Sequence, residues 1–376
     1  MAMKSRRKHL TSVALVFGVI AVVHDQSFGQ SDWKKDWERT IQEAKKEGKL
    51  VVGIPARPEL RKELEALFKN KFAIELESLP ARGPQNASRI ASEYAAGVKY
   101  FDVFMGGSGT YESLVEGGMA APLAPMMLLP EVKEAKNWWG GHIWEDNLSG
   151  NRFLYSFIAD AGTGGFWYNP EQAKAQELRE LNDFLNPKWK GRIGFLDPRT
   201  PGSGQSIWSF LWDVKGESYL RKLLQQDMFI GRDQRQLGDA LAKGKLAFAL
   251  GVSFYTLEGF LNASLPVKEI PALKEGLPSS NGSGVIGVVK DPPHPNAARF
   301  FVNWLLSKEG QELYVKVMHQ STRRLDVNTK WLQEHGVRAA KDVMTVAQYH
   351  KVRNHLEDKY TKVRIPAAKF AEEVLQ

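Results

Sequence analysis

Helix-like and strand-like hydrophobic patterns alternate along the chain after residue 30. In the first segment, apolar residues recur at helical spacing and Lys and Glu fill the opposite face; the apolar positions are Trp33, Trp37, Ile41 and Ala44. Residues 50–54 follow as a short unbroken apolar run, which is typical of a strand buried on both faces. The pattern predicts an α/β protein.

The same alternation continues to about residue 110. It predicts helices over 58–67 and 86–97 and strands over 72–79 and 101–105. A helix between successive strands favours a parallel sheet covered on both faces. In such sheets ligands bind beyond the carboxyl ends of the strands. The loops at that edge are residues 55–57, 80–83 and 106–110.

A second set of elements extends from about residue 110 to 250. Its predicted strands are 153–158, 165–168, 191–196 and 246–250. The loop 197–204, rich in Gly and Ser, enters a helix that carries Ile207, Phe210 and Leu211. Such a loop can offer backbone N–H groups to an anion, although an ordinary capped turn has the same pattern. A strand over 284–289, a helix over 297–318 and further helices complete the chain.

The first 29 residues have the pattern of a secretory signal peptide. Four basic residues lie between Lys4 and Lys8, and the stretch from Leu10 to Val23 is apolar except for Thr11 and Ser12. Small residues around Phe28 predict cleavage before Gln30. The apolar stretch is short for a membrane span, so an uncleaved anchor is the less favoured alternative. We therefore expect export to the periplasm.

Composition narrows the class of protein. The chain has 376 residues, 43% hydrophobic and 25% charged, which suits two or three globular domains. The absence of cysteine excludes disulfide scaffolds, cysteine nucleophiles and a lipid-modified cysteine. The net charge is +8, but no dense basic block follows Lys8, so we expect no nucleic-acid partner.

Catalytic and cofactor motifs are missing or out of context. Residues 282–287 match a dinucleotide fingerprint in letters, but they lead into a strand and then Asp291-Pro292, so no helix N-terminus can hold a pyrophosphate. There is no Gly-x-Ser-x-Gly elbow and no His-Glu-x-x-His helix. We therefore expect a protein without cofactor or resident metal that is not an enzyme.

Four segments resemble the periplasmic solute-binding proteins of ABC importers, in the branch that includes ferric-ion binders and their anion- and polyamine-binding relatives. The segments are 44–52, Phe101-Asp102-Val103-Phe104-Met105, Asn186-Pro187-Lys188-Trp189-Lys190-Gly191-Arg192-Ile193 with Asp197-Pro198, and 295–311. Their order and spacing match the family along nearly all of the chain after residue 30.

The resemblance implies the type II periplasmic binding fold, in which two α/β lobes joined by two crossover strands enclose a ligand cleft. We expect crossovers near 106–110 and 251–255. The expected divisions are 1–29 for the signal peptide, 30–108 with 253–318 for lobe 1, 109–252 for lobe 2, and 319–376 for C-terminal helices packing on the lobes. The resemblance implies a monomer that captures a small solute by hinge closure and delivers it to an inner-membrane permease.

The loops predicted to face the cleft are rich in arginine and hydroxyl side chains. Guanidinium groups match carboxylate or phosphate oxygens in pairs, so a small organic or phosphorus-containing anion is the favoured ligand. Each arginine taken alone is also typical of a solvated surface charge. The predicted binding residues are Arg57, Arg82, Ser108, Thr110, Arg199, Ser203, Ser253, Tyr255 and Arg323. Arg324 is a further candidate, and Trp208 or Tyr255 could cover an apolar part of the ligand.

Two other functions remain open at this point. Ferric binders of the family hold iron with two adjacent tyrosines after the second crossover, and the matching pair here is Phe254-Tyr255. A ferric-iron-binding protein is therefore the alternative, with Tyr255 as its metal ligand. An exported hydrolase on the same scaffold is the second alternative, because fold alone does not fix activity. A sensor that uses the same closure is a third hypothesis.

Overall fold

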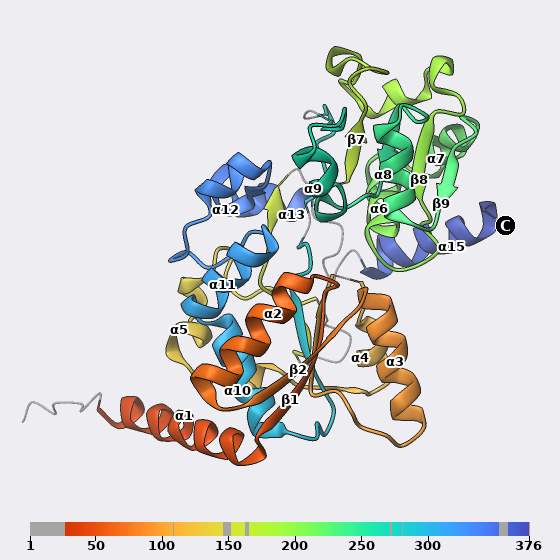
Figure 1. Cartoon of the computed structure of the whole chain (residues 1–376). Helices are drawn as coiled ribbons and strands as arrows, with labels where there is room; N and C mark the ends of the chain where they lie inside the picture. The colour runs from red at the N-terminus through yellow and green to blue at the C-terminus, as the bar shows by residue number, and fades with distance from the viewer. Residues whose placement is uncertain are drawn as a thin grey trace, which may run out of the picture.

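The computed structural model describes residues 27–107, 109–145, 152–161, 165–270, 273–279, 281–352 and 360–375. They form two α/β lobes, one above the other in Figure 1. The signal-peptide prediction falls almost entirely on residues outside this description. Within the described residues, no helix combines the length and apolar character needed to cross a bilayer.

The first lobe is built on a mixed sheet. Its strands are β1 (Lys49–Ile54), β2 (Glu75–Pro80), β3 (Val103–Gly106), β4 (Ala120–Ala121), β5 (Tyr155–Ser156) and β12 (Val285–Val289). The order is β2-β1-β3-β12-β4, and β5 also pairs with β12. β1 is parallel to β2 and β3, whereas β12 is antiparallel to β3, β4 and β5. The predicted parallel arrangement is therefore confirmed for β1, β2 and β3, and β12, which returns from the second lobe, adds the antiparallel part of the sheet.

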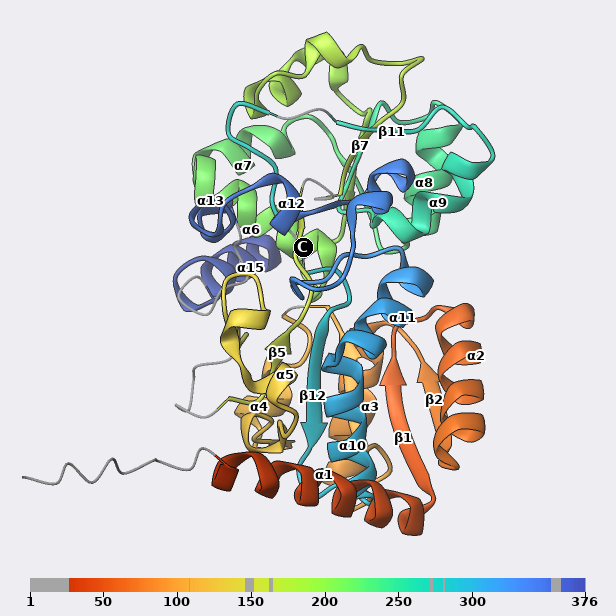
Figure 2. The same cartoon turned by 90° about the vertical axis from the view of Figure 1, so that its left-hand side faces the viewer.

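Helices cover both faces of this sheet (Figure 2). The helices of this lobe are α1 (Ser27–Glu47), α2 (Pro58–Leu67), α3 (Gly83–Ala95), α4 (Glu112–Glu116), α5 (Pro130–Lys133), α10 (Pro295–Leu306) and α11 (Lys308–Met318). α1 packs on α10 and crosses the lower end of the lobe in Figure 2. The short helices η1 (Phe68–Phe72), η2 (Ala124–Met126) and η3 (Ala135–Asn137) connect them.

Aromatic residues anchor α10 to the first lobe. Phe68 of η1 meets Trp304 edge-on with 4.9 Å between ring centroids, and Phe72 meets Phe300 at the same distance. Phe301 is fully buried among them. Burying each large apolar side chain contributes roughly 1.5–3 kcal/mol before entropy is counted, so this cluster holds α10 against η1.

The second lobe has its own five-stranded sheet. Its strands are β7 (Phe166–Tyr168), β8 (Ile193–Leu196), β9 (Phe229–Gly231), β10 (Phe248–Leu250) and β11 (Lys268–Glu269), in the order β11-β7-β10-β8-β9. Its helices are α6 (Ser203–Lys215), α7 (Glu217–Leu224), α8 (Gln234–Ala242) and α9 (Phe254–Asn262), with the short helices η4 (Ala175–Glu177), η5 (Leu181–Leu185) and η6 (Pro187–Trp189).

The lobe boundaries differ from those expected. Residues 120–121 and 155–156 pair within the first sheet, and residues 268–269 pair within the second. The chain therefore passes between lobes after β5 and again between β11 and β12, not near 106–110 and 251–255. β4 and β5 have only two residues each, so no periodic pattern marks them as parts of the first sheet.

The last part of the chain contacts both lobes. β13 (Arg338–Ala339) pairs with β6 (Asp160–Ala161), which lies within the first connection between the lobes. Around it lie η7 (Lys330–His335), α12 (Ala340–Val343) and α13 (Val346–Val352). η8 (Tyr360–Arg364) and α15 (Ile365–Val374) pack on α6 of the second lobe, where Phe370 stacks on Trp208 with ring centroids 6.0 Å apart.

Candidate functional site

A cavity of about 70 Å³ lies at the junction of the two lobes. The second lobe contributes the starts of α6 and α9, and the first lobe contributes the end of α11. Asp160, Gly165, Pro278 and Ser279 line it from the two connections between the lobes, and Val337 from the segment before β13. The cavity is therefore bounded by both lobes and by the segments that join them.

The starts of α6 and α9 lie close together at this cavity. Ser203, Ser206 and Ile207 line it from α6, and residues 252–255 line it from α9. The approach depends on glycine: a Cβ on Gly251, whose φ is +89°, would lie 3.0 Å from the Cα of Gly204. The first N–H groups of a helix have no intrahelical acceptor, so two sets of such donors converge here.

Gln234 of α8 joins the two helix starts. Its Oε1 accepts from the backbone N–H of Ser253 at 2.7 Å and from the Thr256 hydroxyl at 3.1 Å. Its Nε2 donates to Ser203 Oγ at 3.3 Å, and that hydroxyl donates to the Gly251 carbonyl at 2.6 Å. These bonds fix the donors of the second lobe before any ligand binds.

The first lobe contributes residues 318–320 to the cavity. His319 ends α11 in the left-handed conformation, with φ +50°. Its Nδ1 lies 2.7 Å from Glu258 Oε1 of α9, and its ring stacks on His335 with centroids 4.6 Å apart. Gln320 Oε1 accepts from the backbone N–H of Ser283 at 2.9 Å. The His319–Glu258 contact joins the end of α11 to the second lobe, and the other two contacts join it to the segments before β12 and β13.

Asp160 is the buried acid of the cavity. Burial raises its pKa to about 6, although Ser321 opposes the shift through hydrogen bonds, its backbone N–H lying 3.0 Å from Asp160 Oδ1. The charge of Asp160 therefore changes close to neutral pH, at a wall that a ligand would touch.

Arg57 lies beside the cavity and does not line it. Its Nη1 donates to Glu258 Oε2 at 2.7 Å, so an ion pair joins α2 of the first lobe to α9 of the second. Burial alone would raise the pKa of Glu258, but hydrogen bonds from Arg57 and His319 outweigh it and lower that pKa. Glu258 of the second lobe thus contacts both Arg57 and His319 of the first lobe.

The other predicted arginines do not reach the cavity. Arg199 is held by both oxygens of Asp197 and by the Leu375 carbonyl, and Arg82 is exposed at the start of α3. Arg323 is fully buried and donates to the carbonyls of Ser156, Trp139 and Gly141. Their predicted placement at the ligand is therefore wrong for this structure. Groups within the protein already bind the guanidinium groups of Arg199 and Arg323, and the Arg82 side chain lies on the surface.

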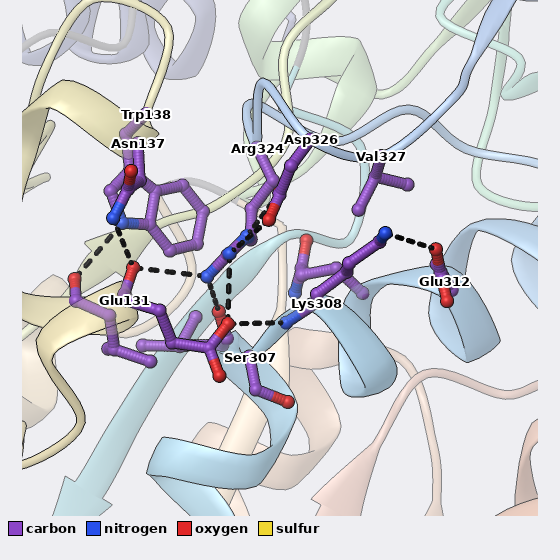
Figure 3. A network of polar contacts seen from close by, with 12 residues as sticks. Glu131, Asn137, Trp138, Ser307, Lys308, Glu312, Arg324, Asp326 and Val327 are labelled. Carbon is purple, nitrogen blue, oxygen red and sulfur yellow. Dashed lines mark hydrogen bonds and ion pairs between the residues drawn. The ribbon is translucent and has the colours of Figure 1, made fainter.

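Arg324 is the centre of a separate polar network in the first lobe (Figure 3). Its guanidinium pairs with both oxygens of Asp326, at 2.8 and 2.6 Å, and with Glu131 Oε2 at 3.0 Å. It also lies over the Trp138 ring, 5.5 Å from the centroid. This arginine ties α5 to the chain that follows α11 and lies outside the cavity lining.

Thr110 and Trp208 are buried away from the cavity. Thr110 packs against Gly83, where an added Cβ would lie 2.6 Å from its Cγ2. Trp208 donates from Nε1 to the Ala367 carbonyl at 2.9 Å beneath α15. Ser108 lies outside the described residues. Ser203, Ser253 and Tyr255 are the predicted residues that line the cavity.

A buried arginine from the C-terminal segment joins the lobes on another side. Arg364 donates from Nη2 to Gln205 Oε1 of α6 at 2.9 Å, and its Nη1 lies 4.0 Å from Glu112 Oε1 of the first lobe. A side chain at Gly109, whose φ is +70°, would overlap this guanidinium. The predicted ligand loop 106–110 is therefore packed by the protein's own C-terminal segment.

Several cavity residues escaped the sequence analysis, notably Asp160, Ser206, Ser279, His319 and Gln320. The only sequence signal for His319 and Gln320 was the polar run His319-Gln320-Ser321 at the end of the predicted helix. For a metal, the described residues hold no group of three or more His, Cys, Asp or Glu that could share one ion.

Comparison with known proteins identifies the family. The model of the bacterial extracellular solute-binding proteins matches residues 55–312. Iron uptake protein A1 of Synechocystis is 25% identical over 160 residues, or 38% of this chain and 43% of that protein. An uncharacterised Haemophilus influenzae protein is 26% identical over 161 residues, 40% of this chain and 45% of that protein. The chain thus spans less than half the length of these curated relatives.

Solved structures share the fold over most of the chain. The ferric binding protein from Campylobacter jejuni has a TM-score of 0.65 at 15% identity, covering 86% of this chain and 99% of that one. The periplasmic binding protein AfuA from Actinobacillus pleuropneumoniae, with fructose-6-phosphate bound, has a TM-score of 0.62 at 17% identity, with the same coverage. These likenesses confirm the type II periplasmic binding fold.

The family is one of binding proteins, which agrees with the prediction that the chain is not an enzyme. The matched region contains the whole second sheet, the first sheet except β1, and the cavity residues from Asp160 to Ser279. This chain belongs to the bacterial extracellular solute-binding proteins.

Proposed function

We propose that this protein is the periplasmic substrate-binding component of an ABC importer and captures a small organic or phosphorus-containing anion. It is exported by a cleaved signal peptide, acts as a monomer and delivers its ligand to an inner-membrane permease. The observation that carries the proposal is the convergence of two helix starts and their serines, Ser203, Ser206 and Ser253, on a cavity between the lobes.

Anion recognition at this cavity does not need arginine. The N-termini of α6 and α9 carry partial positive charge and backbone N–H donors, and both suit carboxylate or phosphoryl oxygens. The Ser253 hydroxyl and the Tyr255 phenol can also donate to an anion, whereas the Ser203 hydroxyl already donates to the Gly251 carbonyl. The cavity of about 70 Å³ has room for the charged head group of a small molecule.

Capture follows from the cavity's position. A ligand that touches α6 and α9 in one lobe and residues 318–320 in the other binds the closed arrangement better than an open one. Its binding energy shifts the population toward closure, which is the form that a permease would recognise. The Arg57–Glu258 ion pair also stabilises the closed form, because it joins the two lobes.

Calorimetric titration with a panel of carboxylates, phosphonates and ferric citrate tests the proposal. We expect saturable binding of one organic anion per chain and no turnover. The Ser206→Ala variant loses one donor and should bind that anion about tenfold more weakly, because a hydrogen bond to a charged group contributes about 1.5–3 kcal/mol. Ser218→Ala is the matched control, since Ser218 is exposed on α7. Failure of every anion to bind would contradict the proposal.

Ferric iron is the second candidate ligand. The Tyr255 phenol is 38% exposed and lines the cavity with His319 and Asp160, which are all side chains that bind iron. Tight binding of the ferric ion alone, with a tyrosinate charge-transfer band that Tyr255→Phe abolishes, would favour iron over an organic anion.

Asp160 distinguishes the two ligands by the sign of a pH effect. An anion binds best when Asp160 is protonated, so its affinity should fall as pH rises through about 6; iron should show the reverse. A carboxylate or sulfonate with constant charge over this range is the proper probe. Asp160→Asn should remove the dependence in either case.

A further inference from the structure

A second and larger cavity, of about 380 Å³, lies on the second lobe beside α9. Phe254, Glu258 and Leu261 of α9 form one wall, and Val267 and Glu269 of the β11 region form another. The turn at residues 334–336 closes it from the C-terminal part of the chain. Phe254 also lines the first cavity, so the two spaces share one residue of α9.

Glu269 is the unusual group in this cavity. Its Oε1 is buried and makes no hydrogen bond within the described structure. Burial raises the pKa of Glu269 to about 8, even though Arg338 acts to lower it. A buried carboxylate without a partner is costly, and a bound cation removes that cost.

The surrounding wall is aromatic and apolar. Trp167 and Phe254 lie with ring centroids 6.4 Å apart, and the Trp167 N–H already donates to the Val252 carbonyl at 2.7 Å. The tryptophan therefore has no polar hydrogen left for a ligand and offers only ring atoms. Aromatic rings beside a carboxylate attract cations that carry alkyl groups.

Among the charged residues that line this cavity, Glu269 is the one best placed to bind a cation. Glu258 is already paired with Arg57 and His319. Glu334 and Lys268 are exposed and carry opposite charges, and His335 is exposed beside them. A ligand that brings one positive charge and a small apolar body would complement this cavity.

We propose that the second cavity binds a small organic ammonium ion, with its charge against Glu269 and its alkyl groups against Trp167 and Phe254. The site is independent of the anion proposed for the cleft. Its occupant would pack between the second lobe and residues 334–336, so it would stabilise the docking of the C-terminal region on α9.

Tetramethylammonium is a suitable probe because its charge does not change with pH. We expect saturable binding to the full chain, followed by calorimetry and Trp fluorescence, that is at least about tenfold tighter at pH about 9 than at pH about 6.5, since the cation binds ionised Glu269. The charged groups facing Glu269 are Arg338, Lys268, Glu258, Glu334 and His335. tert-Butanol, a neutral probe of similar shape, should bind much more weakly.

Glu269→Gln should weaken tetramethylammonium binding at the higher pH by at least about tenfold and remove its pH dependence. Glu334→Gln removes the same charge from an exposed position and should change the affinity by less than about twofold. The proposal is overturned by absence of saturable binding to the wild-type chain, by equal binding of the neutral probe, or by an unchanged affinity in a folded Glu269→Gln variant. Anion binding in the cleft should persist in that variant, so the two proposals fail separately.

Discussion

The two sides of the cleft differ in the groups that they present. The second lobe offers neutral donors, namely the serines and the first N–H groups of α6 and α9. The first lobe and the connecting segments carry an acid and a histidine, with Asp160 and His319 at the cavity and Arg57 beside it. The second lobe thus lines the cavity with neutral groups, whereas the Arg57–Glu258 and His319–Glu258 pairs join the two lobes.

The arginines follow the same division. Arg323 and Arg324 bind carbonyls and carboxylates inside the first lobe, and Arg199 holds Asp197 in the second. Arg57 reaches from one lobe to the other. These arginines therefore make intramolecular contacts that hold the fold and the two lobes together. The three predictions below test this role of the charged groups.

The largest expected effect comes from Arg323→Met. The substitution leaves the carbonyls of Ser156, Trp139 and Gly141 without their donor, so the free energy of unfolding should fall by about 3–5 kcal/mol. Urea unfolding measures this loss. Arg61→Met, which removes an exposed pair with Glu65, is the control and should cost less than about 1 kcal/mol. If Arg323→Met lowered the free energy of unfolding by no more than Arg61→Met does, the buried hydrogen bonds of Arg323 would contribute little to stability.

Asp160→Asn should have an effect that depends on pH. The folded state raises the pKa of Asp160 from 3.8 to about 6, so its favourable contribution is present below about pH 4 and is lost as pH rises through 6. The variant should gain about 3 kcal/mol relative to wild type between pH about 4 and pH about 8. Urea unfolding at both pH values checks this, with Asp36→Asn as an exposed control. A difference that is constant with pH would exclude a raised pKa.

Glu258→Gln should have the smallest effect on stability and a measurable effect on closure. Loss of a partly exposed pair with Arg57 should cost the closed form about 1 kcal/mol, which is roughly fivefold in the closing equilibrium. Ligand affinity should fall by the same factor, and solution scattering without ligand should show a larger radius of gyration. Glu59→Gln is the matched control, because Glu59 contacts Arg57 within the first lobe. Equal effects of the two variants would show that the interlobe pair does not favour closure.

Much of the fold could be predicted from the sequence because long periodic segments carry their own signal. The strands around Val52, Phe195, Phe248 and Ile286 and the helix carrying Phe301 lie where the apolar pattern predicts them. The lobe boundaries could not be predicted, since they depend on two-residue strands, and their pairing is a long-range property.

The candidate site was only partly predictable for a different reason. Ser203 and Ser253 lie at helix starts that follow strands after a loop, so the local pattern places them at the cleft. Whether a guanidinium faces a ligand or the protein's own carbonyls depends on distant backbone, as Arg323 and Arg199 show. His319 and Gln320 reach the cavity through the packing of α11, which no local motif marks.

The docking of α15 has a mechanical consequence. This helix is fastened to the second lobe by Phe370, while the residue before it, Arg364, contacts Gln205 and approaches Glu112 across the divide. The carboxyl-terminal segment thus also links the two lobes, in addition to the two chain connections between their sheets. A proteolytic cut or a bulky fusion at that end should change how far the two lobes can open, although it lies more than a hundred residues along the chain from Ser203, Ser206 and Ser253.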